Sequence, residues 1–431
     1  MARVTPAAER LLVVRRGGEE LAHSPEFQYL RSWNLGEIEA VFGAPAILDD
    51  PAGGDPVVDQ DCSHVLLLAD PNVLLGRRSV AAMRRRLEEG CDVACPALLA
   101  DALAALPVPA AADPVQAGAA GLTSAAGPTD TAVPPPGREP VYTLLGFERV
   151  EEAILARQGQ GVETPGSHLP VSLWRSSALR AAAPDLAWGG LLAAGSAAGG
   201  SAAAGTAVPA ELAPGLRRGL AGVYHRFVDY YAEVRDDILP FVPAGVREVL
   251  EIGCGRGATG KLLQERFGCR VTGVELNPVV AREAARHLHA VLAGDVETLA
   301  IPGRYDLIVA LELFEHLTRQ EEFLARMRAL LEPGGTILLS VPNVGHHAVV
   351  EDLLAGRWDY LPIGLLCYTH YRFFTRATLE SWFHRCGFPH PRLVPQPTEL
   401  PGRFAALARD GPFELDLESL GTKGFYVLLG D

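Results

Sequence analysis

The sequence predicts an α/β fold in which a mainly parallel sheet forms the C-terminal half and a smaller α/β domain precedes it. Strand and helix patterns alternate from residue 247 to residue 342, which is typical of βαβ units. A glycine-rich turn joins the first of these strands to its helix, and a run of small residues separates this half from the rest of the chain. A length of 431 residues suits two or three domains of about 150 residues each.

Low-complexity stretches divide the chain. Of the 19 residues from Gly189 to Ala207, 17 are Gly, Ala, Ser or Thr. Such a stretch buries too little apolar surface to offset the entropy cost of ordering it. The predicted parts, in chain order, are an N-terminal α/β domain at 1–187 with a flexible insertion at 99–138, an Ala/Gly/Ser linker at 188–214, and the main domain at 215–431.

Each element is predicted from its apolar spacing and from its start and stop residues. In the N-terminal domain, we expect a buried strand at 64–70, an amphipathic helix at 77–90 and a short strand at 91–98. No strand is predicted in the residues before position 64. In the main domain, we expect helices at 220–242, 257–268, 281–293 and 320–335, and strands at 247–253, 269–276, 305–311 and 336–342.

Composition excludes several classes of protein. The net charge of −14 argues against broad contact with nucleic acid, because a basic surface is the usual electrostatic footprint of such binding. No signal peptide or membrane span is evident, and the seven cysteines are scattered without CxxC pairs. This cysteine usage is typical of a reducing compartment, so we expect a cytoplasmic protein.

A glycine-rich turn carries the most information. Residues 249–260 read VLEIGCGRGATG, which places Glu251 ahead of Gly253, Gly255 and Gly257 in the form E-x-G-x-G-x-G. Glycine is needed where the backbone passes close to a ligand or adopts positive φ. Dinucleotide sites use the same device, so the loop alone leaves a nicotinamide or flavin enzyme open.

Three acidic residues decide against the dinucleotide. Glu251 would repel a pyrophosphate and attract an ammonium group. Glu275 lies at the end of the next strand, 18 residues beyond Gly257. An acid at this place can accept hydrogen bonds from both hydroxyls of a ribose. Asp295, 20 residues later, can accept an exocyclic adenine amine. The order predicts a ligand with an amino acid end, a ribose and an adenine, which describes S-adenosylmethionine.

This pattern resembles the class I S-adenosylmethionine-dependent methyltransferases, in the group that includes the ubiquinone-biosynthesis O-methyltransferases. The resemblance covers about 210 residues after the linker and implies a Rossmann-like, mainly parallel sheet of seven strands. It implies S-adenosylmethionine as the cofactor. The residues that it implies for cofactor binding are Glu251, Gly253, Gly255, Gly257, Glu275, Asn277, Asp295, Val296 and Leu311.

The residues expected to face the methyl acceptor, here called the acceptor side, follow the fourth predicted strand. Glu312, Glu315 and His316 stand at i, i+3 and i+4, so a helix starting here would place them on one face, and His370 comes much later. This order resembles methyltransferases that chelate a divalent cation, which implies Mg²⁺ or Mn²⁺. The alternative is that the acids cap a helix or touch the cofactor. Without a metal, His316 is the predicted general base, with Glu315 beside it as the second catalytic residue.

Further segments are candidates for the walls of the site. The helix Val223–Pro240, with Tyr224, Tyr230 and Tyr231, is a candidate lid, and 344–371 a candidate wall for an apolar or ring-shaped acceptor. Plain packing explains both equally well. His346 and His347 either line the acceptor site or are solvated loop residues, and His287 and His289 are predicted to be structural, on a helix away from the loops.

The N-terminal half faintly resembles family 2 glycosyltransferases of the GT-A type. The departure is at the acidic motif, where Asp70 and Asn72 stand in place of two acids; we therefore interpret this half as a degenerate or partnering domain. The leading hypothesis is O-methylation of a small-molecule or saccharide acceptor in a biosynthetic pathway. The alternatives are a bifunctional glycosyl- and methyltransferase and a non-catalytic scaffold that binds S-adenosylmethionine. An RNA methyltransferase is disfavoured by the acidic net charge.

Overall fold

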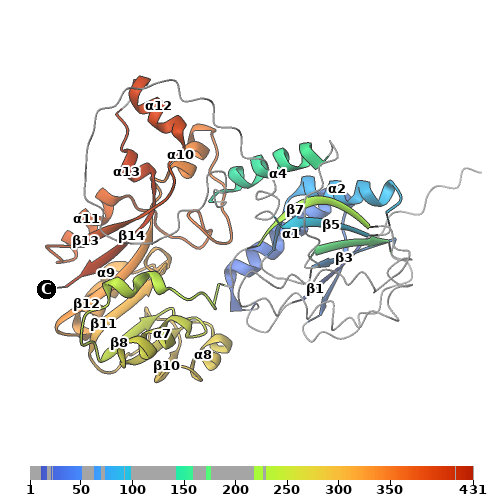
Figure 1. Ribbon diagram of the computed structural model, residues 1–431. Helices are drawn as coiled ribbons and strands as arrows, with labels where there is room; N and C mark the ends of the chain where they lie inside the picture. Colours follow the sequence, from blue (N-terminus) through green and yellow to red (C-terminus); the bar gives the residue numbers. More distant parts are fainter. Residues whose placement is uncertain are drawn as a thin grey trace, which may run out of the picture.

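The structure is a computed structural model in which two sheets form two units (Figure 1). Asp70 and Asn72, the predicted insertion at 99–138 and the predicted linker at 188–214 lie outside the described residues. Within the part of the chain that is described, no helix is both long and apolar enough to cross a bilayer. The described residues are 11–16, 21, 23–50, 63–68, 73–91, 93–98, 142–158, 171–175, 218–226, 230–412 and 414–430.

The first unit contains a mixed sheet of seven strands in the order β2-β1-β3-β6-β5-β7-β4. Strands β1, β2 and β3 are parallel neighbours. The strand β1 was not predicted, because its LLVVRR sequence is short and flanked by charge. The elements are β1 Leu11–Arg16, α1 Pro25–Phe42, β2 Ala46–Asp50, β3 His64–Leu68, β4 Val73–Leu75, α2 Arg77–Glu88, β5 Val93–Leu98, α4 Leu144–Gln158, β6 Val171–Arg175 and β7 Arg218–Arg226.

Helices α1 and α2 pack on this sheet. Ile38 of α1 and Met83 of α2 belong to the same buried cluster as Leu66 of β3. The buried Asn34 of α1 donates to the carbonyl of Val73 over 2.6 Å and accepts from the amide of Leu75 over 2.9 Å. An amide side chain buried in this way pairs with backbone that would otherwise lack partners, so it fixes how α1 lies against β4.

The predicted helix at 220–242 is wrong. Residues 218–226 form strand β7, which pairs in parallel with β5 and antiparallel with β4. Tyr224 therefore belongs to the first sheet and not to a lid, and residues 236–241 form only a short 3₁₀ turn, η2 Asp236–Phe241. Pairing with two distant strands outweighs the weak local helix preference here.

The second unit contains a seven-stranded sheet in the order β10-β9-β8-β11-β12-β14-β13. Strands β8 to β12 are parallel, and β14 is antiparallel to both of its neighbours. The Rossmann-like class I methyltransferase fold predicted for this half is confirmed. Its strands are β8 Glu248–Ile252, β9 Arg270–Glu275, β10 Ala290–Ala293, β11 Tyr305–Leu311, β12 Leu331–Pro342, β13 Arg392–Pro397 and β14 Thr422–Leu429.

Helices cover both faces of the second sheet. One buried cluster joins Val249 and Val309 to α7 and α8, and another joins Leu250 and Ile308 to α9 and α11. Neighbouring residues of one strand thus serve opposite faces, as the period of two requires. The helical elements are α7 Ala258–Phe267, α8 Pro278–Ala284, η3 Phe314–His316, α9 Gln320–Leu330, α10 His347–Leu354, α11 Arg376–Arg385, α12 Gly402–Asp410 and α13 Leu417–Leu420.

Two predicted helices of this unit end earlier than expected. Helix α8 stops at Ala284, and residues 290–293, predicted as its last turn, form β10 in register with β9 from Ala290 to Ala293. Helix α9 stops at Leu330, and Leu331 already pairs with Tyr305 of β11. In both places the apolar spacing is compatible with a longer helix, but hydrogen bonding to a neighbouring strand of the sheet stops the helix earlier.

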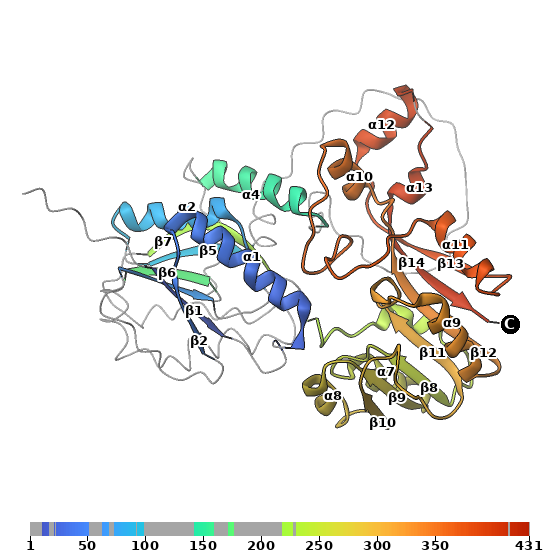
Figure 2. The same ribbon diagram turned by 180° about the vertical axis from the view of Figure 1, so that it is seen from behind.

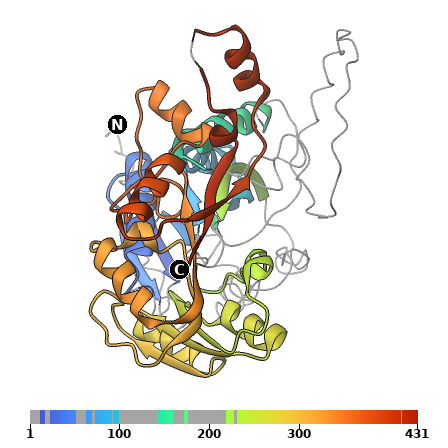
Figure 3. The ribbon, with the colours of Figure 1, turned by 90° about the vertical axis from the view of Figure 1, so that its left-hand side faces the viewer.

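The two units contact each other through α1 and α4. Figures 1 and 2 show the N-terminal end of α1 and the nearby end of α4 reaching toward the second unit, and Figure 3 shows that unit in front of the first. The ring of Tyr29 stacks on Tyr368 with centroids 4.5 Å apart, and Thr143 donates to Asp352 over 3.1 Å. These contacts place residues of the first unit next to the loops of the second.

Candidate active site

The sheet topology brings the predicted cofactor residues to one edge. Strands β8, β9, β10 and β11 are parallel neighbours, so their carboxyl ends lie together, where open α/β sheets bind ligands. The segments at the carboxyl ends of these four strands are 253–257, 275–277, 294–296 and 311–316.

The glycines of the loop occupy positions where a side chain would be strained or would clash. Gly255 has φ 53°, and a Cβ there would lie 2.6 Å from the carbonyl oxygen of Tyr231. Gly257 has φ 81° and caps the N-terminus of α7. Both positions need the left-handed conformation that glycine adopts without strain, so the sequence pattern has a direct steric cause.

Glu275 is fixed against this loop. Its Oε2 accepts from the amide of Gly255 over 3.0 Å, and its Oε1 accepts from the amide of Asn277 over 2.9 Å. The side chain is only 6% exposed, and burial raises the pKa of the Glu275 carboxyl although these backbone bonds oppose the shift. Asn277 caps α8 by accepting from the amide of Val279 over 3.1 Å, which gives its side-chain oxygen a structural role.

Glu251 is buried near the carboxyl end of β8. Its side chain is 5% exposed, and its Oε2 has no hydrogen-bond partner among the described residues. A Cβ added at Gly260 would come within 2.4 Å of this oxygen, so the carboxyl borders the first turn of α7. Burial raises the pKa of Glu251 to about 8. The predicted contact of Glu251 with a ligand ammonium stays a prediction.

The third predicted acid follows β10. The Oδ1 of Asp295 accepts from the amide of Glu297 over 2.8 Å, and its backbone carbonyl accepts from Leu299 over 2.8 Å. Asp295 is exposed, whereas Val296 is 7% exposed. Leu311 is half-buried at the end of β11. The exposed carboxylate of Asp295 suits a hydrogen bond to the edge of an adenine, and the apolar Val296 suits contact with its face. These are the two roles predicted for them.

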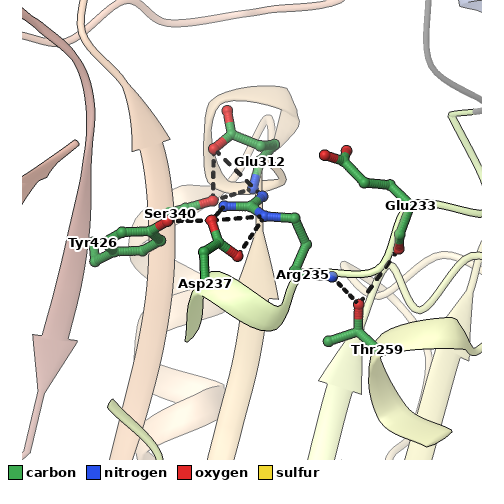
Figure 4. Close-up of polar contacts among 7 residues, drawn as sticks. All are labelled: Glu233, Arg235, Asp237, Thr259, Glu312, Ser340 and Tyr426. Atoms are coloured by element: carbon green, nitrogen blue, oxygen red, sulfur yellow. Dashed lines mark hydrogen bonds and ion pairs between the residues drawn. The ribbon is translucent and has the colours of Figure 1, made fainter. Parts of the chain in front are cut away.

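Glu312 differs most from its prediction. It has φ 47°, the only positive φ of a non-glycine among the described residues, and the backbone turns there without starting an α-helix. Its Oε1 accepts from the hydroxyl of Ser340 over 2.6 Å and lies 4.0 Å from the guanidinium of Arg235 (Figure 4). Arg235 also pairs with Asp237, which accepts from Tyr426. Glu312 is therefore held by an arginine and a hydroxyl.

The other three predicted metal ligands do converge. One ligand atom from each of Glu315, His316 and His370 lies within 4.8 Å of the other two. Nε2 of His370 is 3.8 Å from Oε1 of Glu315, and the two imidazole rings meet edge to face at 4.7 Å. The amide of Tyr371 donates to the carbonyl of Glu315 over 2.9 Å, which holds the His370 loop against η3. The predicted set of four thus reduces to three.

Electrostatics at this cluster follow from its burial. The carboxyl of Glu315 is fully buried, neither oxygen has a partner among the described residues, and desolvation followed by the charge of Glu312 raises its pKa well above the usual range. Desolvation lowers the pKa of His316, against the charges of Glu26 and Glu312. Desolvation also lowers the pKa of His370 to about 3.

The other predicted histidines are structural or exposed. His346 is completely buried, accepts from the amide of Ala348 at the start of α10 and pairs with Thr398 over 2.9 Å. His347 is 3% exposed, so neither is a solvated loop residue. His287 and His289 are exposed in the turn between α8 and β10, so the helix predicted for them is wrong.

Residues of the first unit reach this site, which the sequence did not indicate. Oε1 of Glu26 accepts from the hydroxyl of Thr369 over 3.1 Å, and that hydroxyl lies 2.9 Å from Nδ1 of His316. Phe27 packs on Tyr231 with ring centroids 6.2 Å apart. Glu26 and Thr369 are separated by 343 positions, so no local motif could have linked them.

Comparison with known proteins finds similarity mainly in the second unit. Residues 224–389 match the family model described as "Methyltransferase domain". Among curated proteins, the ubiquinone biosynthesis O-methyltransferase of Xanthomonas euvesicatoria is 31% identical over 157 residues, which are 33% of this chain and 63% of that protein. The enzyme of the same name from Nitrobacter winogradskyi is 35% identical over 159 residues, 33% of this chain and 57% of that protein. The chain thus spans less than two thirds of these relatives.

Solved structures are similar at lower identity. A SAM-dependent methyltransferase from Archaeoglobus fulgidus has 18% identity and a TM-score of 0.35, and the match covers 45% of this chain and 91% of that one. The N-terminal domain of EvdMO1, solved with SAH bound, has 19% identity and a TM-score of 0.33 over 48% of this chain and 85% of that one. Residues 224–389 therefore match a methyltransferase domain, and the sheet that holds most of them has the Rossmann-like topology described above.

Proposed function

We propose that the protein is an S-adenosylmethionine-dependent methyltransferase that methylates a hydroxyl group of a small-molecule or saccharide acceptor. The observation that carries the proposal is the position of Glu275, whose two oxygens are tied to the amides of Gly255 and Asn277 at the carboxyl end of β9. A carboxylate has about four acceptor sites. The two not used by these amides suit the vicinal hydroxyls of a ribose.

The residues of this edge fit the cofactor. Gly253 and Gly255 have positive φ and carry no side chain at their two positions in the loop, Glu275 supplies hydroxyl acceptors, and Asp295 is exposed beside Val296. When bound there, S-adenosylmethionine supplies an electrophilic methyl group on a sulfonium. The chain has to hold an acceptor in line with that methyl group, exclude water and remove one proton, which is mostly a matter of positioning and desolvation.

His316 is the proposed general base. Its Nδ1 faces the hydroxyl of Thr369 at 2.9 Å, which leaves Nε2 as the ring nitrogen available to an acceptor hydroxyl. Glu315 and His370 lie beside it. Oxygen is the proposed atom to be methylated, since the relatives matched here are named O-methyltransferases and an imidazole base suits a hydroxyl.

A divalent cation at Glu315, His316 and His370 is a second proposal for the same site. Two observations favour it. The three ligand atoms lie within 4.8 Å of one another, and neither oxygen of the buried Glu315 has a hydrogen-bond partner among the described residues. One carboxylate with two imidazoles suits Mn²⁺ or another first-row transition metal better than Mg²⁺, which prefers oxygen ligands. Such an ion would lower the pKa of an acceptor hydroxyl.

Calorimetry with S-adenosylhomocysteine and transfer of a labelled methyl group test the proposal together. Purified full-length protein is titrated with S-adenosylhomocysteine and then incubated with labelled S-adenosylmethionine and a panel of catechols and saccharides. Saturable binding and base-stable label in an acceptor are expected. Binding without any product across the panel would favour the scaffold alternative, and loss of turnover after chelation, restored by Mg²⁺ or Mn²⁺, would support the cation.

A further inference from the structure

Three segments that are far apart in the sequence meet at one hydroxyl group. The hydroxyl of Thr369 is 3.1 Å from Oε1 of Glu26 and 2.9 Å from Nδ1 of His316. Glu26 is in the first turn of α1, in the first unit, and is 7% exposed. Its other oxygen accepts from the hydroxyl of Ser24 over 2.9 Å. The site described above therefore includes a carboxylate from the other unit.

The chemistry of these groups sets the direction of the hydrogen bonds. An ionised carboxylate only accepts, and a threonine hydroxyl has one proton to donate. When that proton points to Glu26, the oxygen of Thr369 can only accept from His316. Nδ1 of His316 must then carry its proton, and Nε2 is left with a lone pair. The thiol of Cys367, 3.2 Å from the same hydroxyl, is a much weaker acceptor than a carboxylate and does not compete for the proton.

We propose that Glu26 of the first unit and Thr369 are positioning residues that fix His316 in the tautomer protonated at Nδ1, so that Nε2 faces the acceptor as a lone pair. The inference deepens the proposed function and rests on it for the role of Nε2. The hydrogen bonds from His316 through Thr369 to Glu26 suit both proposed roles of Nε2, as a base and as a metal ligand, because both roles need the same lone pair.

The packing of α1 keeps Glu26 in place. Tyr29, one turn further along α1, donates to the carbonyl of Tyr360 over 3.1 Å and stacks on Tyr368. Phe27 lies in one buried cluster with Tyr231 and Val280 of the second unit. Since Asn34 fixes the same helix to β4, the orientation of the first unit is transmitted to His316. The methyltransferase domain is thus incomplete without the first unit.

The test observes the tautomer directly in the full-length protein. Histidine is labelled with ¹⁵N, S-adenosylhomocysteine is added, and the signals of His316 are assigned by their loss in His316→Gln. The wild type is expected to give a protonated Nδ1 and an unprotonated Nε2. Glu26→Leu, which removes both acceptor oxygens at similar size, and Thr369→Val are each expected to move His316 toward the other tautomer or a mixture. Thr369→Ser keeps the hydroxyl and is expected to keep the wild-type pattern.

The control applies the same change elsewhere on the same helix. Glu39 is exposed on α1, and Glu39→Leu is expected to leave the tautomer and the turnover unchanged. With a catechol that the wild type methylates, kcat should fall about 10- to 100-fold in Glu26→Leu and in Thr369→Val. The KM for S-adenosylmethionine should stay within about twofold, and the double variant should lose no more than either single one.

Each outcome decides the inference. An unchanged Nδ1-protonated tautomer in both Glu26→Leu and Thr369→Val, with folding intact by circular dichroism, would overturn it, as would additive losses of kcat in the double variant. The NMR readout needs no acceptor, so absence of methyl transfer by the wild type would sink the proposed function and leave the tautomer result standing. If Glu26→Leu fails to fold, Thr369→Val and Thr369→Ser give the same answer from the other side of the hydrogen bond.

Discussion

The two sides of the site are built in different ways. The cofactor side is assembled from consecutive segments: the loop after β8, the end of β9 and the end of β10 lie within about 45 residues of sequence and join through backbone bonds such as Gly255 to Glu275. The acceptor side joins His316 and Thr369, which are 53 positions apart, to Glu26, which is 343 positions from Thr369. One side depends on the local strand–turn–helix geometry, and the other depends on how two units pack.

Because the two sides are built separately, we expect variants to affect either cofactor binding or the state of the proposed base, and not both. Changes on the cofactor side should alter affinity for S-adenosylhomocysteine and leave the tautomer of His316 as it is. Changes at Glu26 or Thr369 should do the reverse.

Gly255→Ala should cause the largest loss on the cofactor side. The new Cβ would lie 2.6 Å from the carbonyl oxygen of Tyr231 at a φ of 53°, so the loop must shift. Affinity for S-adenosylhomocysteine should fall by about 100-fold or more, with about 1–3 kcal/mol lost from the free energy of unfolding. Gly268→Ala is the matched control: its φ is 66°, but no atom lies within 4 Å of the added Cβ. Calorimetry should find its affinity unchanged; an equal loss in both variants would contradict the steric account.

Stability should fall as pH rises, because of Glu251. Its pKa is about 8 in the folded protein against an ordinary 4.5, so the folded state holds a proton that the unfolded state releases. The stabilisation is complete below pH 4.5 and is lost as pH rises to 8, by on the order of 4 kcal/mol.

Urea unfolding at several pH values checks this sign. Glu251→Gln is neutral at every pH, so its stability should decline less than that of the wild type between pH 5 and pH 8. Glu315, another buried carboxyl with a raised pKa, is not among the charges that act on Glu251, so its contribution is the same in both proteins and cancels in the comparison. Parallel curves for the two proteins would show that Glu251 titrates normally.

Glu275→Ala should weaken binding of S-adenosylhomocysteine about 10- to 100-fold, because both ribose acceptors and the tie to Gly255 are lost. The fold should persist. Glu265→Ala, on the exposed surface of α7 where it pairs with Lys261, provides the control and should bind normally. Unchanged affinity in Glu275→Ala would remove the ribose assignment and the main support for the proposed function.

Arg357→Ala should have the smallest effect. Arg357 binds Glu148 of α4 over 2.6 and 3.2 Å and Asp359 of its own unit over 2.5 Å, with all three side chains partly exposed, and such pairs contribute about 0–1 kcal/mol each. The free energy of unfolding should change by no more than this, and the ¹⁵N signals of His316 should not move, since α1 and not α4 carries Glu26. A shifted tautomer would mean that docking through α4 also governs the acceptor side.

Local patterns predicted most of the cofactor side, because its function needs particular residues at particular places on a strand–turn–helix unit. Gly255 and Gly257 have positive φ, and Glu275 ends β9, as the spacing indicated. The same reasoning failed where a distant strand decides the conformation: 218–226 and 290–293 were predicted as helix and are strands. It also failed at Glu312, whose backbone turns at φ 47° and whose carboxylate pairs with Arg235.

The α/β order of the second half, its glycine loop and the acids at its strand ends could be predicted from the amino-acid pattern, since hydrophobic period and backbone sterics act over a few residues. Long-range packing instead sets the position of β7 between β5 and β4, the separation of Glu312 from the Glu315 cluster, and the contact of Glu26 with Thr369. These contacts depend on the docking of segments separated by long stretches of chain, and no pattern in the intervening residues encodes them.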